Sequence, residues 1–164
     1  MAILKIEMLG SEVLRRRADE VAGPDPELDR LIESMFETMY DAQGIGLAAP
    51  QVGISRRVIV VDVNEPEQVP FAMLNPVVVE SSEERDRGEE GCLSIPGITG
   101  VVDRPLRVVV EGVDRAGKPL RIEADGMLAR CLQHEIDHLD GVLFVDRLSP
   151  LKRRMVLAKW RKRG

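Results

Sequence analysis

The sequence predicts an α+β fold, in which mixed or antiparallel strands surround a central helix within a single compact domain. Three observations support this class. The chain has 164 residues, which suits one domain better than two. Helical and strand-like patterns both occur, and they do not alternate regularly as in a doubly wound sheet. No segment has the composition of a linker, so we expect one domain over residues 1–164.

Two helices are predicted in the first part of the chain. Ser11 is a suitable N-cap for a short helix over residues 11–17. Apolar residues recur at helical spacing over residues 26–42, which predicts an amphipathic helix. Gly44 is expected to end that helix, because glycine readily adopts the backbone conformation that closes a helix.

Strands are predicted where β-branched residues cluster. Four segments meet this condition: residues 57–63, 73–80, 106–113 and 120–123. Pro76 marks an edge or a bulge in the second of them, because proline cannot donate to a strand ladder. The last two segments flank a turn over residues 114–118 and are expected to form a hairpin. Residues 81–90 are polar without a period, so we expect a surface loop there.

The second part of the chain holds two further predicted helices. Residues 125–139 form a strong helix pattern, with Asp125 as its cap and Asp140 and Gly141 at its end. A last helix is expected over about residues 150–163, where Ser149 is a cap and Pro150 takes the first helical position.

Composition excludes several classes of protein. No apolar run approaches the ~20 residues that cross a bilayer, so we expect no membrane association. The N-terminus lacks the basic start and the apolar stretch of a secretory signal. Two cysteines are too few for a disulfide scaffold, and we expect free thiols in a cytoplasmic protein.

Charge is unevenly distributed along the chain. The net charge is −5, yet residues 147–164 hold eight basic residues and no acidic one. The remainder of the chain is therefore strongly acidic. A basic last helix indicates contact with an anionic partner, or else a solvated face on which Leu151, Met155, Leu157 and Ala158 pack inward.

The sequence His-Glu-x-x-His on the predicted helix 125–139 carries the chemistry. His134 and His138 lie at positions i and i+4, hence on one helical face, where both imidazoles can bind one metal ion. Glu135 projects beside that ion and can take a proton from water. The chain contains two histidines, and both lie in this motif. That coincidence favours a metal site over a chance match.

A third protein ligand is required, because catalytic metals usually have three protein ligands and one open position. Cys131 is a poor candidate, since three ligands on one helix would span ~10.5 Å of its axis, and a packed core thiol is its expected role. Asp140 and Asp146 remain possible. Cys92 is more suggestive, because Gly91 beside it permits close backbone approach. A buried structural thiol is the alternative for Cys92.

A glycine-rich segment over residues 44–53 is the other unusual feature. Its simplest interpretation is a helix end followed by a tight turn. It lacks the Gly-Lys-Ser/Thr ending of a phosphate loop, which argues against nucleotide binding. Small residues there would let an extended peptide lie against the backbone, and Gln51 could donate its amide N–H to a developing oxyanion.

Together, three segments resemble the peptide deformylase family, which shows G-x-G-x-A-A-x-Q, E-G-C-L-S and Q-H-E-x-D-H in this order. They stand here at residues 44–51, 90–94 and 133–138. Three motifs in order are highly specific, and the resemblance covers nearly the whole chain. The short form of the family also ends in an α-helix.

The resemblance implies a metal held by Cys92, His134 and His138. In the family the metal is typically Fe(2+), which Zn(2+), Ni(2+) or Co(2+) can replace. It also implies that the enzyme removes the formyl group from the N-terminal formyl-methionine of newly synthesised proteins and releases formate. By the same resemblance, a bound metal would supply hydroxide for attack on the formyl carbon, and Glu135 would act as the acid/base.

Further roles follow from the same resemblance. Gln51 and the Leu93 N–H correspond to the oxyanion donors. Six positions correspond to the substrate-binding site, the apolar ones lining a methionine pocket: Gly44, Ile45, Gly46, Gly91, Met127 and Cys131. Three residues depart from patterns seen in some members: Thr99 in place of an arginine that contacts substrate, and Arg130 and Gly88 in place of apolar pocket residues.

The expected partners are N-formylmethionyl nascent peptides, with no DNA. The basic last helix is either a solvated face or a contact with the ribosome near the exit tunnel, as is thought for the family. A His-Glu-x-x-His metallopeptidase is the main rival function, although no Glu or His follows His138 as its further ligand. A structural metal site in a nucleic-acid-binding module is a second rival, but such sites usually have four protein ligands.

Overall fold

The computed structural model describes residues 2–163 and has an α+β architecture, as predicted. A five-stranded sheet has the order β1-β2-β3-β6-β7, and a two-stranded ribbon is formed by β4 and β5. Met1 and Gly164, which belong to the predicted domain, lie outside the described residues. The sheet strands are β1 (Gly46–Ala48), β2 (Val58–Val61), β3 (Phe71–Ser81), β6 (Arg107–Val113) and β7 (Pro119–Asp125).

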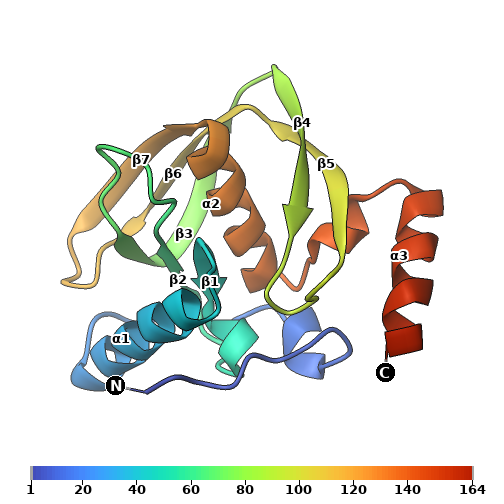
Figure 1. Ribbon diagram of the computed structural model, residues 1–164. Coiled ribbons are helices and arrows are strands. Elements are labelled where there is room, and N and C mark those ends of the chain that lie inside the picture. The colour runs from blue at the N-terminus through green and yellow to red at the C-terminus, as the bar shows by residue number, and fades with distance from the viewer. Residues whose placement is uncertain (1, 164) are drawn as a thin grey trace.

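Helix α2 (Gly126–Leu139) lies at the centre, between the sheet and the ribbon (Figure 1). Its apolar side chains, which include Leu128, Leu132 and Leu139, pack on Ile59 and Met73 of the sheet. The helix begins one residue later than predicted. Asp125 occupies the N-cap position, but its side chain makes no capping hydrogen bond, so that part of the prediction is wrong.

Helix α1 (Pro26–Asp41) covers the β1–β2 end of the sheet (Figure 1). The Asp25 carboxylate accepts a hydrogen bond of 2.7 Å from the Leu28 N–H and begins the helix. The inward face of α1 forms a second apolar cluster with the sheet: Leu28, Ile32, Met35 and Met39 with Leu47, Val58 and Val60. The short predicted helix over residues 11–17 is instead a 3-10 turn, Glu12–Arg15, and Ser11 does not cap it.

The ribbon of β4 (Arg85–Gly91) and β5 (Thr99–Pro105) corrects the predicted loop over residues 81–90. β4 has no apolar alternation, because only Glu90 in it is buried. Its stability comes from ladder hydrogen bonds to β5, which propensity does not reveal. Strands β2, β3, β6 and β7 match the prediction to within a few residues, whereas β1 was not predicted, because residues 44–53 were interpreted as a helix end and a tight turn. A register shift at Pro76 in β3 confirms the expected bulge, and β6 and β7 form the expected hairpin.

Helix α3 (Pro150–Arg163) lies beyond the ribbon, on the side away from the sheet (Figure 1). The Ser149 hydroxyl accepts a hydrogen bond from the Lys152 N–H at 3.3 Å, as expected for a cap. The predicted inward face was wrong in part, because Leu151 is 63% exposed and Met155 57%. Leu157 does pack inward as predicted, together with Val156 and Trp160, which were not predicted to do so.

The N-terminal strap, residues 2–25, wraps across elements that come later in the chain. The Leu9 N–H donates to the Ser94 carbonyl at 2.9 Å, and the Ala18 N–H donates to the Leu139 carbonyl at 2.8 Å. Two short 3-10 turns complete the fold, Ala49–Val52 after β1 and Phe144–Arg147 before α3. None of the helices in the described part of the chain is both long and apolar enough to cross a membrane.

Candidate metal centre

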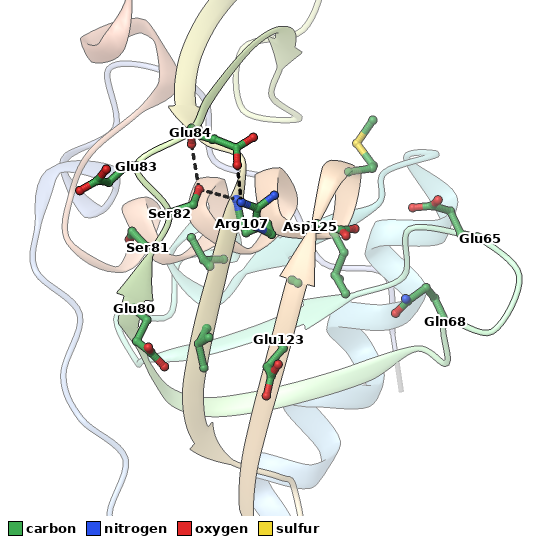
Figure 2. A pocket seen from close by; sticks show the side chains of 15 residues that line it. Glu65, Gln68, Glu80, Ser81, Ser82, Glu83, Glu84, Arg107, Glu123 and Asp125 are labelled. Carbon is green, nitrogen blue, oxygen red and sulfur yellow. Dashed lines mark hydrogen bonds and ion pairs between the residues drawn. The ribbon is translucent and has the colours of Figure 1, made fainter.

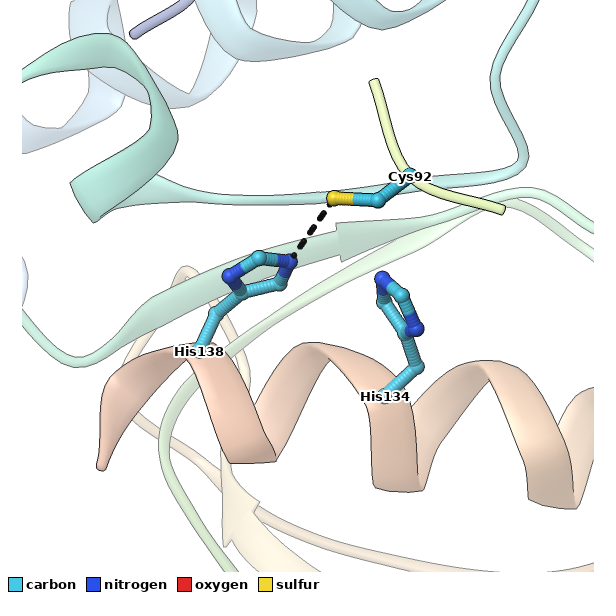
Figure 3. A group of neighbouring side chains, drawn as sticks. All are labelled: Cys92, His134 and His138. Atoms are coloured by element: carbon cyan, nitrogen blue, oxygen red, sulfur yellow. Dashed lines mark hydrogen bonds between the residues drawn. The ribbon is translucent and has the colours of Figure 1, made fainter. Parts of the chain in front are cut away.

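Helix α2 and the loop after β4 bring together three side chains of types that can bind a metal. His134 and His138 project from one face of α2, and Cys92 comes from the loop that follows β4 (Figure 3). Their ligand atoms all lie within 4.8 Å of one another. The Cys92 Sγ is 3.3 Å from the His138 Nε2. One thiolate and two imidazoles are a donor set that suits a divalent transition metal with an open position.

The other candidates for a third ligand point elsewhere. Asp140 forms an ion pair with Arg57 at 3.0 Å, and Asp146 accepts a hydrogen bond from the Leu143 N–H at 2.9 Å. Cys131 is buried, and its thiol lies 3.5 Å from the Ile45 carbonyl oxygen. The structure thus brings Cys92 to the histidine pair, and not the alternatives that the sequence left open.

Glu90 orients the first imidazole. Its carboxylate Oε1 lies 3.0 Å from the Nδ1 of His134, which leaves the Nε2 of that ring for a metal. The same carboxylate pairs with the buried Arg104 guanidinium. Although burial opposes it, hydrogen bonds from Arg104 and His134 hold the pKa of Glu90 well below its usual range. An anionic carboxylate at this place favours a proton on the Nδ1 of His134.

Arg104 extends this arrangement to the C-terminal end of α2. Its Nη1 lies 3.0 Å from the Asp137 carboxylate, which also pairs with Arg147. The sequence analysis included Glu90 in the segment 90–94 but gave it no role, and it did not identify Arg104. A pairing between a buried carboxylate on one strand and an arginine on the next requires knowledge of the ribbon, which the sequence did not predict.

Glu135 is buried beside the histidine pair. Burial raises the pKa of its carboxyl to about 7, against the opposing attraction of His134. Among the described residues, two buried side-chain atoms lack a hydrogen-bond partner, Glu135 Oε1 and His138 Nδ1. An unpartnered carboxylate oxygen next to three metal-binding atoms is what a site for a metal and a polarised water requires. The residues present therefore fit a metal.

Gln51 approaches the same point from the turn after β1. Its Nε2 lies 3.6 Å from the Cys92 Sγ and 3.2 Å from the Ser94 hydroxyl. Its Oε1 accepts a hydrogen bond from the Ala48 N–H at 3.0 Å, so the direction of the amide group is fixed. The amide N–H therefore faces the cluster, where it can donate to an oxyanion.

A cavity of about 650 Å³ opens onto these residues. Its lining includes every position expected to bind substrate: Gly44, Ile45, Gly46, Gly91, Met127 and Cys131. It also includes Cys92, Leu93 and Glu135, so the cavity and the metal cluster form one site. Gly46 is needed here, because a Cβ there would lie 2.7 Å from both the Cys131 Sγ and the Glu135 Oε2. Thr99 does not line the cavity, whereas Arg130 does.

Comparison with known proteins identifies the family. The model of the polypeptide deformylase family matches residues 3–154. The chain belongs to the polypeptide deformylase family. A peptide deformylase from Thermodesulfovibrio yellowstonii is 50% identical to it over 163 residues, covering 98% of each chain. Another, from Chromohalobacter salexigens, is 53% identical over 163 residues, covering 99% of this chain and 96% of the relative.

Solved deformylase structures have the same fold. A peptide deformylase from Legionella pneumophila superimposes with a TM-score of 0.92 at 50% identity, covering 98% of this chain and 95% of that one. The Ehrlichia chaffeensis enzyme in complex with actinonin gives 0.94 at 40% identity, covering 100% and 99%. These findings confirm the predicted family, fold class and enzyme class: the chain is a deformylase of a metal-dependent family. Neither rival function describes this family.

A second hollow, of about 880 Å³, does not resemble a deformylase site (Figure 2). Carboxylates dominate its lining: Glu65, Glu80, Glu83, Glu84, Glu123 and Asp125. Arg107 is its one basic residue, and it pairs with Glu84 at 2.7 Å. No thiol or imidazole lines it, although Met127 borders both hollows. The chemistry therefore belongs to the smaller, more apolar cavity.

Proposed function

We propose that Cys92, His134 and His138 hold one divalent metal, and that the enzyme removes the formyl group from the N-terminal formyl-methionine of newly synthesised proteins. The observation that carries this proposal is the convergence of the three donor atoms within 4.8 Å, beside the unpartnered oxygen of the buried Glu135. Fe(2+) is the proposed native metal, with Zn(2+), Ni(2+) or Co(2+) as substitutes, because a thiolate–imidazole donor set suits these ions.

Each residue of the site is assigned a part in the hydrolysis. When bound, the metal supplies Lewis acidity that makes water a nucleophile near neutral pH and polarises the formyl carbonyl. The oxygen of water bonds to the formyl carbon, and Glu135 receives the proton that water loses. The Gln51 amide and the Leu93 N–H donate to the oxygen on which charge develops. The C–N bond then breaks, Glu135 returns the proton to the leaving amine, and formate departs.

Substrate binding is assigned to the cavity. The methionine side chain is expected to occupy the apolar part lined by Ile45, Met127 and Cys131. Gly44 and Gly91 leave backbone accessible beside the cavity, where an extended peptide can form main-chain hydrogen bonds, while the buried Gly46 leaves room for substrate deeper inside. The side chain of Met127 is half exposed, so it can adjust to the peptide that enters.

The two cysteines provide a direct test of the metal site. Cys92→Ala is expected to abolish metal retention and formate release, because it removes one of three ligands. Cys131→Ala is the matched control and is expected to retain the metal, since its thiol lies against the Ile45 carbonyl. Metal content by elemental analysis and formate release should be measured together under anaerobic conditions. Full metal occupancy of Cys92→Ala would refute the ligand set.

The basic helix α3 suggests where the enzyme meets its substrate. We propose that it contacts the ribosome near the exit tunnel, in the cytoplasm, where formylated nascent chains emerge. Support comes from charge and exposure: Lys152, Arg154 and Lys159 are exposed on α3, as are the neighbouring Leu151 and Met155. A basic helix face of this kind binds phosphate backbones through electrostatic attraction.

A further inference from the structure

Arg130 occupies an unusual place in the wall of the active-site cavity. It lies four residues before His134 on α2, and therefore on the same helical face. Its side chain is nearly fully buried, although arginine is seldom buried without partners. The catalytic steps above give this guanidinium no task, so its position needs a separate explanation.

Four contacts hold the guanidinium against the ribbon. The Nη1 atom donates to the Glu90 Oε2 at 2.6 Å and to the Val102 carbonyl at 3.0 Å. The Nη2 atom donates to the Asp86 carbonyl at 2.8 Å and lies 3.3 Å from the Asp86 carboxylate. Arg130 thus joins α2 to both β4 and β5, with nearly all of its binding capacity on the Nη side used inside the protein.

Gly88 makes room for this arrangement. A Cβ at residue 88 would lie 3.0 Å from both the Cζ and the Nε of Arg130, which is closer than ordinary packing allows. The guanidinium therefore packs against the backbone of β4 at a residue that has no side chain. Arg130 and Gly88 depart together from an apolar pocket wall, and the geometry explains why: the arginine fits because the residue beneath it has no side chain.

Glu90 connects Arg130 to the first histidine. One carboxylate oxygen, Oε2, is bound by Arg104 and Arg130, while the other, Oε1, is bound by Arg104 and faces the His134 Nδ1. Removing Arg130 would take one of two donors from Oε2 and leave Arg104 to hold both oxygens alone, so the position of the carboxylate beside the imidazole would be less tightly fixed. Groups that orient a metal-binding histidine typically affect metal affinity or activity by about 10–100-fold.

We propose that Arg130, resting on Gly88, is a positioning residue for the metal centre. It fixes the Glu90 carboxylate and, through it, the ring orientation and tautomer of His134, besides forming part of the cavity wall. This inference rests on the proposed function, since it presumes that His134 binds a metal. It assigns to this pair of residues a task that the three motif segments do not describe.

The first experiment compares two arginine variants in the cobalt-loaded enzyme. Arg130→Met keeps the apolar stem and removes the hydrogen bonds, and it should speed the loss of Co(2+) to excess chelator by about tenfold. The cobalt–thiolate absorption should shift as well, because the ligand geometry relaxes. Arg85→Met is the matched control: Arg85 pairs with Asp103 on the exposed face of the same ribbon, so cobalt loss should be unchanged.

A second variant tests the contact between Arg130 and Gly88 without removing a charge. Gly88→Ala should displace the guanidinium by a few tenths of an ångström and speed cobalt loss in the same direction as Arg130→Met, by a smaller factor. In the Arg130→Met background the added methyl group should have no further effect, because nothing remains for it to displace. Additive effects of the two substitutions would overturn the pairing. This cycle also keeps the proposal testable if Arg130→Met folds poorly.

The outcomes separate this inference from the proposed function. If the parent enzyme binds cobalt and both variants release it at the parent rate, Arg130 is only a structural ion pair or a wall residue, and the inference fails. A raised KM for a formyl-methionyl peptide with unchanged kcat, spectrum and cobalt loss would be the mark of a wall residue. If the parent itself fails to bind cobalt, the proposed metal site fails first.

Discussion

Helices α2 and α3 have the same length, 14 residues, yet they meet opposite demands. On α2, polar side chains such as Gln133, His134 and Glu135 are buried, and other elements approach the helix from two sides. On α3, one side packs and the remainder faces solvent. A buried polar residue must be matched by partners from elsewhere in the chain, whereas an exposed one is constrained mainly by charge. The two helices should therefore respond very differently to substitution.

The largest effect on turnover is expected at Glu135, the proposed acid/base on α2. Glu135→Gln preserves the shape of the side chain but cannot accept a proton, so kcat should fall by about 10²–10⁴-fold. Metal content should stay near that of the parent, because Glu135 is not among the proposed ligands. Glu83→Gln, in the acidic hollow, is the matched control and should turn over at the parent rate. Near-normal turnover of Glu135→Gln on a formyl-methionyl peptide would remove Glu135 from its role.

Stability should differ between the helices for the same chemical change. Leu132 on α2 is fully buried, so Leu132→Ala should lower the free energy of unfolding by about 2–5 kcal/mol. Leu151 on α3 is 63% exposed, so Leu151→Ala should change it by no more than about 0.5 kcal/mol. Urea denaturation of the metal-loaded proteins measures both. Similar losses of unfolding free energy for the two variants would show that burial does not distinguish the helices.

Substitutions of the basic residues of α3 should have the smallest effect on turnover and should mainly weaken binding to ribosomes. Replacing Lys152, Arg154 and Lys159 with glutamine should weaken co-sedimentation with ribosomes and flatten its salt dependence. Cleavage of a short formylated peptide should be unaltered. These substitutions are preferable to deleting residues 152–164, because Val156 and Trp160 pack against the body of the protein. Unchanged co-sedimentation would contradict the ribosome contact.

The sequence could predict what periodicity and local spacing encode. The apolar period defined α1 and α2, and the i, i+4 spacing placed His134 and His138 on one face. Cys92 needed the family resemblance, since spacing merely argued against Cys131. Strands β4 and β5 were not predicted, because neither sequence has a strong apolar alternation. β4 buries a single side chain, that of Glu90.

Because the ribbon of β4 and β5 was not predicted, the partners of Glu90 could not be predicted either. The partnerships of Glu90 with Arg104 and Arg130 depend on which residues of β4 and β5 face one another and which face α2. No short-range pattern contains that information, because the residues concerned lie 14 and 40 positions apart. The proposed metal ligands were therefore predictable, whereas the residues that contact and orient them were not.

The N-terminal strap sets the order in which this protein can be completed during synthesis. Its backbone hydrogen bonds reach Ser94 and Leu139, so this segment must wait for residues translated much later. Contacts of such long sequence separation slow folding and leave partly folded chains exposed. Docking of the strap onto the end of α2 closes the fold only when most of the chain has been translated. An enzyme that acts on proteins at the start of their existence thus finishes its own folding late.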